Sequence, residues 1–442
     1  MRSAVNLRTL HIAFPLTLTT MSNNSTKWYS SVTRAQWLVL LIASLGWVFD
    51  AFEGQLFNLT RGAMLADLLR VPPGDVQVRQ WGDIFLGVFL AGGTLGGLLF
   101  GMLGDKFGRK PVMVLTILFY SIFSGLTSFA TELWHVGALR FLVAMGVGGE
   151  WAVAAALVAE VFPKSARTQA GGIFHTTGVL GTWLATLVAM NVGDGWRTAY
   201  LVGIVPALLT LWVRASVEEP HSWQEARTSG RRMGSYAELF GDPRWRRRAL
   251  LGMTLAAVGL GTFWGVCIAT QDLVRELLLR QGISAHEAEN KAKFAYGIIQ
   301  ALGAGVGQLC FGPISVRLGR RSTFALMHVL SFIMVVSVCY LPNAYWQMLV
   351  LLPLLGFAAL SIHSGYAIYF PELFPNHLRA TGAGFCFNAG RLLAAPVLLL
   401  SGHVKTLMSL PNAVALLGCL FLLGLAALAF LPETRGQDLP EA

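Results

Sequence analysis

Two segments of this chain repeat each other at nearly constant spacing, and this duplication limits the architecture more than any other feature. Gly108-Arg109-Lys110 in the first half corresponds to Gly319-Arg320-Arg321, which lies 211 residues later. The pattern Glu-x-Phe-Pro-x-x-x-Arg runs from Glu160 to Arg167 and again from Glu372 to Arg379, 212 residues later. Because two motifs recur with almost the same offset, we expect two halves of similar structure related by a common axis.

Long apolar runs indicate that both halves cross a membrane. Hydrophobic residues make up 55% of the 442 residues, charged residues only 13%, and the mean hydropathy is +0.59. The runs are about 20 residues long, enough for a helix to cross a hydrocarbon core of roughly 30 Å. Since lipid cannot satisfy backbone polar groups, each run is expected to be helical. The predicted fold is an all-α membrane protein with twelve transmembrane helices in two pseudo-symmetric six-helix halves.

A charged break near the middle of the chain separates the halves. Segment 217–248 contains seven arginines mixed with acidic residues, so we interpret it as a cytoplasmic linker whose charges face solvent and lipid headgroups. Residues 1–20 carry charges that break any signal-peptide core, and we interpret them as disordered or as lying upstream of a true start at Met21. The expected organisation is a cytoplasmic extension 1–35, a half 36–216, the linker 217–248, a half 249–431 and a cytoplasmic tail 432–442.

Basic residues set the expected orientation. With both termini in the cytoplasm, the inner segments hold 22 of the 33 lysines and arginines and the outer loops hold 9. The positive-inside rule therefore predicts a multi-pass protein of the plasma (inner) membrane with both termini inside. This bias accounts for most of the net charge of +10, so nucleic-acid binding is not expected. The five cysteines lack metal-ligand spacing and no phosphate-binding loop is present, which favours a non-enzymatic protein without metal or cofactor.

Segment 101–110, GMLGDKFGRK, resembles the signature between helices 2 and 3 of the major facilitator superfamily. The Glu-x-Phe-Pro-x-x-x-Arg pattern in both halves and segment 432–436, PETRG, resemble motifs of its sugar porters. The resemblance implies charge pairs that hold an inner gate shut and open as the halves rock. Val316 replaces Asp105 in the second copy, so we expect a stronger lock in the first half. The implied gating residues are Asp105, Arg109, Lys110, Glu160, Arg167, Arg320, Glu372 and Arg379.

Further motifs resemble metabolite:proton symporters. Segment 46–53, GWVFDAFE, is similar to helix 1 of sialate, lactate and aromatic-acid proton symporters, and Asn388-x-Gly-Arg391 is similar to a motif of carboxylate carriers. Thr270-Gln271-Asp272 matches part of a lactate-permease motif, but Trp264 and Ile268 depart from it. The resemblance implies proton-coupled transport, with lactate itself in doubt.

Charged residues inside the predicted helices need a partner, a wet cavity or a function. Asp50 and Arg140 lie at similar depths, roughly 13 and 10 Å from the outer membrane face. They are expected to form either a switching proton site or a permanent salt bridge. Glu53 shares a helix face with Asp50, and carboxylates so close together suit a proton carrier. Glu150 is either a second proton relay or part of the inner lock.

Arg391 falls near mid-membrane and offers a planar fork suited to a carboxylate. The alternative is a pairing with an acidic residue of helix 1 or 7. His175 and His363 are candidates for a proton path or for packing. The full set of predicted substrate-binding residues is Arg391, Asn388, Gln271, His363, Tyr366, Trp151 and His175.

The sequence therefore predicts a monomeric secondary transporter that imports a small organic anion, a monocarboxylate or sugar acid, together with protons. Its expected partners are this anion, protons and the lipid bilayer. The alternatives are a neutral sugar or metabolite porter, a proton-driven efflux antiporter of the same fold and a membrane receptor that does not transport. Arg391 favours an anionic substrate. Dependence of uptake on an inward proton gradient would distinguish import from efflux.

Overall fold

The computed structural model describes residues 28–440 except 73–74, 193–194, 229 and 231. In this described part every regular element is a helix. The expectations for residues 1–20 and for a start at Met21 lie outside the described residues.

The first half consists of six passes. They are α1 (Arg34–Leu69), α2 (Val76–Phe107), α3 (Arg109–Thr127), α4 (Leu133–Val161), the pair α5 (Arg167–Thr176) and α6 (Gly178–Val192), and the pair α7 (Trp196–Val202) and α8 (Pro206–Ser216). A short 3₁₀ turn, η1 (Trp28–Ser31), precedes them, and two linker helices follow, α9 (His221–Thr228) and α10 (Tyr236–Gly241).

The second half repeats this plan. Its passes are α11 (Pro243–Thr262) with η2 (Phe263–Cys267) and α12 (Ala269–Arg280), then α13 (Ala285–Phe294) with η3 (Ala295–Gln300) and α14 (Ala301–Leu318), then α15 (Arg320–Tyr340), α16 (Tyr345–Glu372), α17 (Arg379–Leu407), and α18 (Leu410–Gly418) with α19 (Leu420–Phe430). A 3₁₀ turn, η4 (Asn376–Leu378), precedes α17. Among the described residues, ten passes are long and apolar enough to cross a membrane, and α7–α8 and α17 complete the twelve expected.

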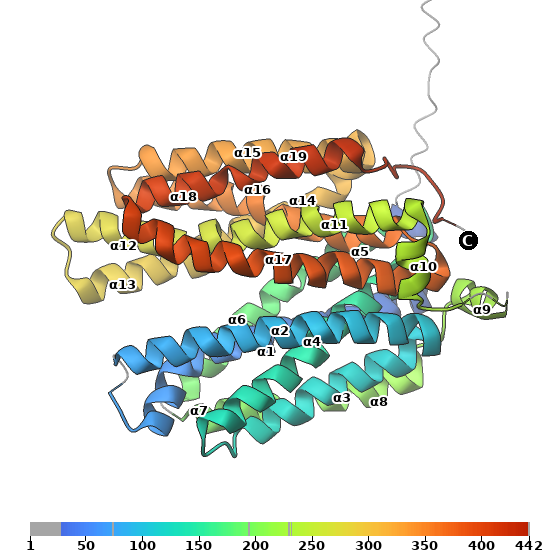
Figure 1. The fold of residues 1–442 in the computed structure, drawn as a ribbon, viewed down its shortest axis with the longest axis horizontal. Helices are drawn as coiled ribbons and strands as arrows, with labels where there is room; N and C mark the ends of the chain where they lie inside the picture. Colours follow the sequence, from blue (N-terminus) through green and yellow to red (C-terminus); the bar gives the residue numbers. More distant parts are fainter. Residues whose placement is uncertain (1–27, 73–74, 193–194, 229, 231, 441–442) are drawn as a thin grey trace, which may run out of the picture.

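The halves lie side by side as two elongated bundles (Figure 1). One end carries α9, α10 and the C-terminal segment, and we call it the linker end. The opposite end carries the connections between α6 and α7 and between α12 and α13, and we call it the far end. The halves contact each other mainly through α2 with α17, and α5 with α14 and α16.

Glycines of α2 serve two different interfaces. A Cβ atom on Gly92 or Gly96 would lie 2.3 or 2.0 Å from a backbone oxygen of α4, within the same half. A Cβ atom on Gly97 would instead lie 1.9 Å from the Asn388 amide of α17, in the other half. Gly92 and Gly96 therefore allow close packing within the first half, and Gly97 allows close packing between the halves.

The repeated Gly-Arg motifs make the same tight turn in both halves. Gly108 has φ 113° and Gly319 has φ 92°, a region that side chains rarely tolerate. The Glu219 carboxylate accepts hydrogen bonds from the backbone N–H groups of Arg109 and Lys110, each at 2.9 Å. Glu433 does the same for Arg320 and Arg321, at 2.9 and 3.0 Å. A carboxylate therefore caps the first turn of α3 and of α15, where the helix dipole favours negative charge.

The linker is not only a solvated surface. Trp223 of α9 donates its indole N–H to the Asp105 carbonyl at 2.7 Å, and the Tyr236 hydroxyl donates to a backbone oxygen of α2 at 2.7 Å. Glu238 of α10 contacts the His377 ring at 2.7 Å. The linker thus packs across the linker end and contacts both halves, which corrects the expectation that its charges only face solvent and headgroups.

Candidate functional site

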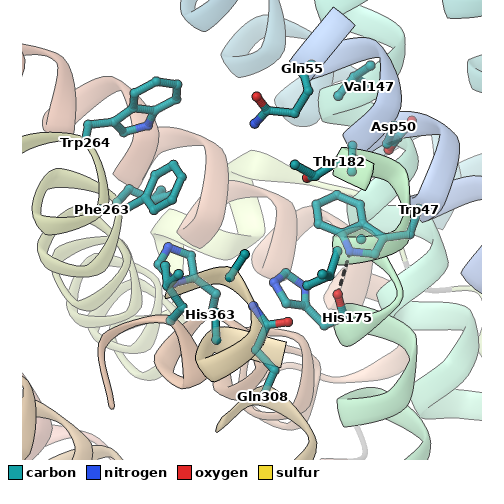
Figure 2. A pocket seen from close by; sticks show the side chains of 18 of the residues that line it. Trp47, Asp50, Gln55, Val147, His175, Thr182, Phe263, Trp264, Gln308 and His363 are labelled. Carbon is teal, nitrogen blue, oxygen red and sulfur yellow. Dashed lines mark hydrogen bonds between the residues drawn. The ribbon is translucent and has the colours of Figure 1, made fainter. Parts of the chain in front are cut away.

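A cavity of about 300 Å³ lies between the two halves, midway along α1. Its wall comes from α1, α2, α4, α5 and α6 of the first half and from α11, η2, η3, α14, α16 and α17 of the second half. Figure 2 shows Trp47, Asp50 and Gln55 facing His363 and Phe263 across this space. Because both halves supply the wall, relative motion of the halves would change the cavity.

Five aromatic residues contribute to the apolar wall, namely Trp47, Phe89, Phe263, Trp264 and Tyr296. Phe263 and Trp264 belong to η2, and Tyr296 belongs to η3. Both elements are short π-helical turns inside longer helices. Such turns are uncommon and are often found at functional sites.

Polar groups are few and come from several helices. Gln300 of η3 is held in place, since its Oε1 accepts from Thr270 at 2.6 Å and its Nε2 donates to the Cys267 carbonyl at 3.1 Å. By contrast, Gln308 Oε1 lacks a hydrogen-bond partner among the described residues. The His363 ring is within reach of the backbone oxygens of Ala359 and Leu360, one turn earlier in α16. Both side chains line the cavity.

His175 is fixed by two tryptophans. Its backbone oxygen accepts from Trp47 Nε1 at 2.7 Å, and the two rings stack with centroids 5.0 Å apart. Trp151 Nε1 donates to its Nδ1 at 3.3 Å. His175 therefore lines the cavity with a defined ring orientation, while Trp151 supports it from behind and does not line the cavity.

Asp50 and Glu150 form a buried carboxylate pair. They come from α1 and α4, and their side chains are within hydrogen-bonding reach of each other. A Cβ atom on Gly46, one turn before Asp50, would lie 2.4 Å from Glu150 Oε1. In the described part of the chain none of their four oxygens receives a hydrogen bond from another residue. A shared proton would satisfy this pair, because two ionised carboxylates so close together repel each other.

Arg391 of α17 faces this pair from the other half. Its guanidinium lies within electrostatic reach of Asp50. It stacks on Phe387 with 5.3 Å to the ring centroid, and its Nη1 fills the space over Gly93 of α2. That Nη1 is buried without a hydrogen-bond partner among the described residues, while Arg391 lines the cavity. The predicted alternative was a pairing of Arg391 with an acidic residue of helix 1 or 7. Asp50 of α1 lies within electrostatic reach, but no ion pair joins it to Arg391 among the described residues.

The expected Asp50–Arg140 pair is not formed. Arg140 lies between the rings of Phe57 and Phe89, at 4.6 and 4.3 Å from their centroids, and its Nη1 donates to the Glu53 carbonyl at 3.3 Å. Equal depth misled the prediction, because Arg140 points to the side of α1 that carries Glu53. The Glu53 carboxylate accepts from the Ser124 hydroxyl at 2.7 Å, behind the cavity wall.

Three of the seven predicted substrate-binding residues line the cavity, namely Arg391, His363 and His175. Tyr366 does not, since it is buried among rings and donates to the Leu255 carbonyl at 2.8 Å. Asn388 bonds to the backbones of α4 and α17, and Gln271 lies on α12 outside the lining set. Four further polar residues line the cavity and were not predicted, namely Gln55, Thr182, Gln300 and Gln308. Each of them is an isolated amide or hydroxyl in an apolar run, and this pattern could have identified them from the sequence.

A first ion-pair network closes the linker end. Arg109 binds Asp105 at 2.6 Å and Glu160 at 2.8 Å, and Glu160 also binds Arg379 of the other half at 2.8 Å. Asp105 accepts from the backbone N–H groups of Ala380 and Thr381 at 3.1 and 2.7 Å. Its carboxylate therefore caps the first turn of α17, and the network joins the two halves. Lys110 contributes only its backbone N–H to Glu219 here.

A second network repeats the first with the halves exchanged. Arg320 binds Glu372 at 2.8 Å and donates to the Thr168 hydroxyl of the first half at 2.6 Å. Arg167, a predicted gating residue, lies within electrostatic reach of Glu372 and of Glu160, and forms no ion pair with either among the described residues. The cross-half backbone contacts of Asp105 have no counterpart at Val316, whose side chain is 42% exposed. Glu150 belongs to neither lock, which leaves the proton-relay alternative.

Comparisons with known proteins agree with this architecture. The sequence model of the Major Facilitator Superfamily matches residues 62–397. The chain is 30% identical to a probable 4-methylmuconolactone transporter of Cupriavidus pinatubonensis over 92% of this chain and 93% of that protein. It is 28% identical to the sialic acid transporter NanX of Escherichia coli over 85% and 89% of the two chains.

The solved structure of the proton:xylose symporter XylE bound to 6-bromo-6-deoxy-D-glucose has the same fold. It superposes with a TM-score of 0.75 at 17% identity, covering 91% of this chain and 97% of that one. Two six-helix halves, a cavity between them, ion-pair locks at one end and the sequence match lead to one conclusion: this chain belongs to the Major Facilitator Superfamily and is a membrane transporter without enzymatic activity.

Proposed function

We propose that the protein imports a small organic anion together with protons by alternating access. The observation that carries this proposal is the Arg391 guanidinium: Arg391 lines the cavity within electrostatic reach of Asp50, and its Nη1 has no hydrogen-bond partner among the described residues. A guanidinium in such a place suits the carboxylate of a substrate. Relatives named for sialic acid and 4-methylmuconolactone transport support a small organic metabolite as cargo.

Coupling follows from competition for Arg391. While Asp50 is ionised, its charge attracts the guanidinium and repels an incoming anion. A proton taken up by the Asp50–Glu150 pair removes that charge and leaves Arg391 free for the substrate carboxylate. The proton and the anion then bind together and carry no net charge. Their movement through the membrane therefore costs less free energy than movement of the anion alone.

The remaining predicted residues support this scheme in specific places. His175 and His363 offer hydrogen bonds to the rest of the substrate, and the aromatic wall holds its apolar part. Glu53 and Arg140 lie behind the cavity wall. Phe89 connects Arg140 to the cavity, because its ring packs on the Arg140 guanidinium and also lines the cavity. The locks at the linker end hold the cavity shut on that side, which we assign to the cytoplasm of the plasma membrane.

The test is uptake by proteoliposomes of the full chain, with labelled organic acids beginning with sialic acid. An inward proton gradient should drive accumulation above equilibrium, and a protonophore should abolish it. Uptake of neutral xylose under the same conditions serves as the control substrate. Accumulation of a neutral sugar but of no acid, or accumulation indifferent to the proton gradient, would contradict the proposal.

A further inference from the structure

A basic and apolar groove lies on the membrane-facing side of the second half at its linker end. The groove has a volume of about 480 Å³ and is lined by Pro243, Arg246, Arg247, Leu250, Leu251 and Phe430. It is formed where the beginning of α11 meets the end of α19. It is separate from the central cavity, with which it shares no lining residue.

The groove has a charged rim and an apolar floor. Arg246 and Arg247 are both exposed and form no salt bridge with any described residue, and the Arg247 guanidinium lies 6.0 Å from the Phe430 ring centroid. Leu250 is 42% exposed and Phe430 61% exposed. The neighbouring arginines are engaged elsewhere: Arg244 and Arg248 stack on Trp245, and Arg248 also donates to the Leu373 carbonyl at 2.8 Å. Arg246 and Arg247 therefore present charges to the groove that no ion pair among the described residues neutralises.

We propose that this groove binds one anionic phospholipid of the membrane leaflet on the linker side. The arginines stand where the apolar run of α11 begins, which is the level of the lipid headgroups, and they are complementary to a phosphodiester. Leu250 and Leu251 follow the arginines along α11 toward the hydrocarbon, and together with Phe430 they offer apolar contacts to acyl chains. A second copy of this chain is disfavoured as occupant, because two such faces would bring four arginines together.

The position also determines what the lipid does. Both helices of the groove belong to the second half, so the bound lipid bridges elements that move together. We therefore expect it to stabilise the folded protein without favouring either face of the transport cycle. This inference does not depend on the proposed substrate or on proton coupling.

The experiment uses the purified full chain in mild detergent, with lipid retention measured by native mass spectrometry and stability by thermal unfolding. The probes are phosphatidylglycerol, phosphatidylcholine with the same acyl chains, and glycerol phosphate. Phosphatidylglycerol should be retained and raise Tm, and the other two should do neither. Arg246→Gln/Arg247→Gln should weaken retention by about tenfold or more, whereas Arg227→Gln/Arg232→Gln, which removes the same charge from the linker, should not.

Phe430→Ala provides a second probe that leaves the charges intact, and it should also shorten lipid retention. Equal retention by the groove variant and the linker control would overturn the proposal. So would equal binding of phosphatidylcholine, which would remove the role of charge, or equal stabilisation by glycerol phosphate, which would make the site a phosphate site without acyl contacts.

Discussion

Arg391 and Asp50 approach each other from opposite halves of the molecule, and this geometry gives each residue a separate task. The arginine packs against Phe387 and the bare backbone at Gly93, so its guanidinium has little freedom to turn away. Asp50 is 1% exposed and meets Glu150 in the first half. A carboxylate substrate would therefore meet a preset cation and a nearby site for a proton.

Replacing Arg391 with lysine tests the first task. Lysine keeps the charge but loses the planar fork, so the affinity for an organic acid should fall about tenfold or more, about 1.4 kcal/mol. Arg391→Ala should abolish binding while the protein still folds. The measurement is ligand-induced thermal stabilisation, with Arg227→Lys in the linker as the matched control. Unchanged affinity in Arg391→Ala would make the arginine structural.

Replacing Asp50 with asparagine tests the second task. Asparagine imitates the protonated acid, so Arg391 is free at every pH and acid binding should no longer weaken as pH rises. Exchange of labelled for unlabelled substrate should persist, but accumulation against a gradient should be lost. Asp67→Asn, on the same helix outside the cavity, serves as the control. Normal proton-driven accumulation by Asp50→Asn would rule out its role.

At this scale the sequence identified the charged residues but not their partners. Asp50, Glu150, Arg140 and Arg391 are conspicuous because charge is costly in lipid. Their pairing depends on the rotation of each helix about its axis, which depth along the helix does not specify. Arg140 contacts Phe57, Phe89 and the Glu53 carbonyl. The matched depths of Asp50 and Arg140 could not reveal these contacts.

A single helix can contact its own half at some positions and the other half at others, and α2 is the clearest case. Gly96→Ala would place a methyl group 2.0 Å from the Met145 carbonyl oxygen inside the first half, so it should destabilise the fold by about 1–3 kcal/mol. Gly97→Ala meets the Asn388 side chain of the other half and should leave Tm near that of the wild type while impairing transport. Thermal unfolding and substrate exchange separate the two. A reversed pattern would show that the interfaces are assigned wrongly.

The lock helices give a second prediction at this scale. Asp105→Asn removes a carboxylate that accepts three hydrogen bonds from the first turn of α17. Each such bond to a charged group contributes about 1.5–3 kcal/mol, so the linker end should open at least about tenfold more often. Cysteine labelling of Gly297→Cys in the cavity from the linker side should rise accordingly. Val316→Asn, at the equivalent place in the second half, should leave labelling unchanged.

The repeat allowed the sequence to anticipate the locks, since Glu160 and Glu372 each bind the arginine of their own half. It did not reveal that Arg379 would complete the first lock and Thr168 the second, because those contacts exist only in the assembled molecule. It also did not predict that Glu219 and Glu433 cap the first turns of α3 and α15. They occupy corresponding places after the sixth and twelfth passes, and that recurrence was readable.

At the scale of the whole molecule, ion pairs that join the two halves close the linker end of the cavity, so a transport cycle requires this closure to change ends. Phe107 and Leu318 are exposed at the linker end of α2 and α14, and Phe129 and Leu341 are exposed at the far end, after α3 and α15. The members of each pair occupy corresponding places in the two halves. Spin labels at these four positions report the separation of the halves at both ends.

We expect an organic acid added at low pH to shorten the Phe129–Leu341 label distance and lengthen the Phe107–Leu318 distance. The two changes should have opposite sign, because rigid halves that rock about a central site close one end as they open the other. Pulsed electron paramagnetic resonance on the doubly labelled chains measures both distances. The Asp105→Asn variant should show the longer linker-end distance without ligand. Changes of the same sign at both ends would indicate expansion of the bundle, and rocking of the halves would then be excluded.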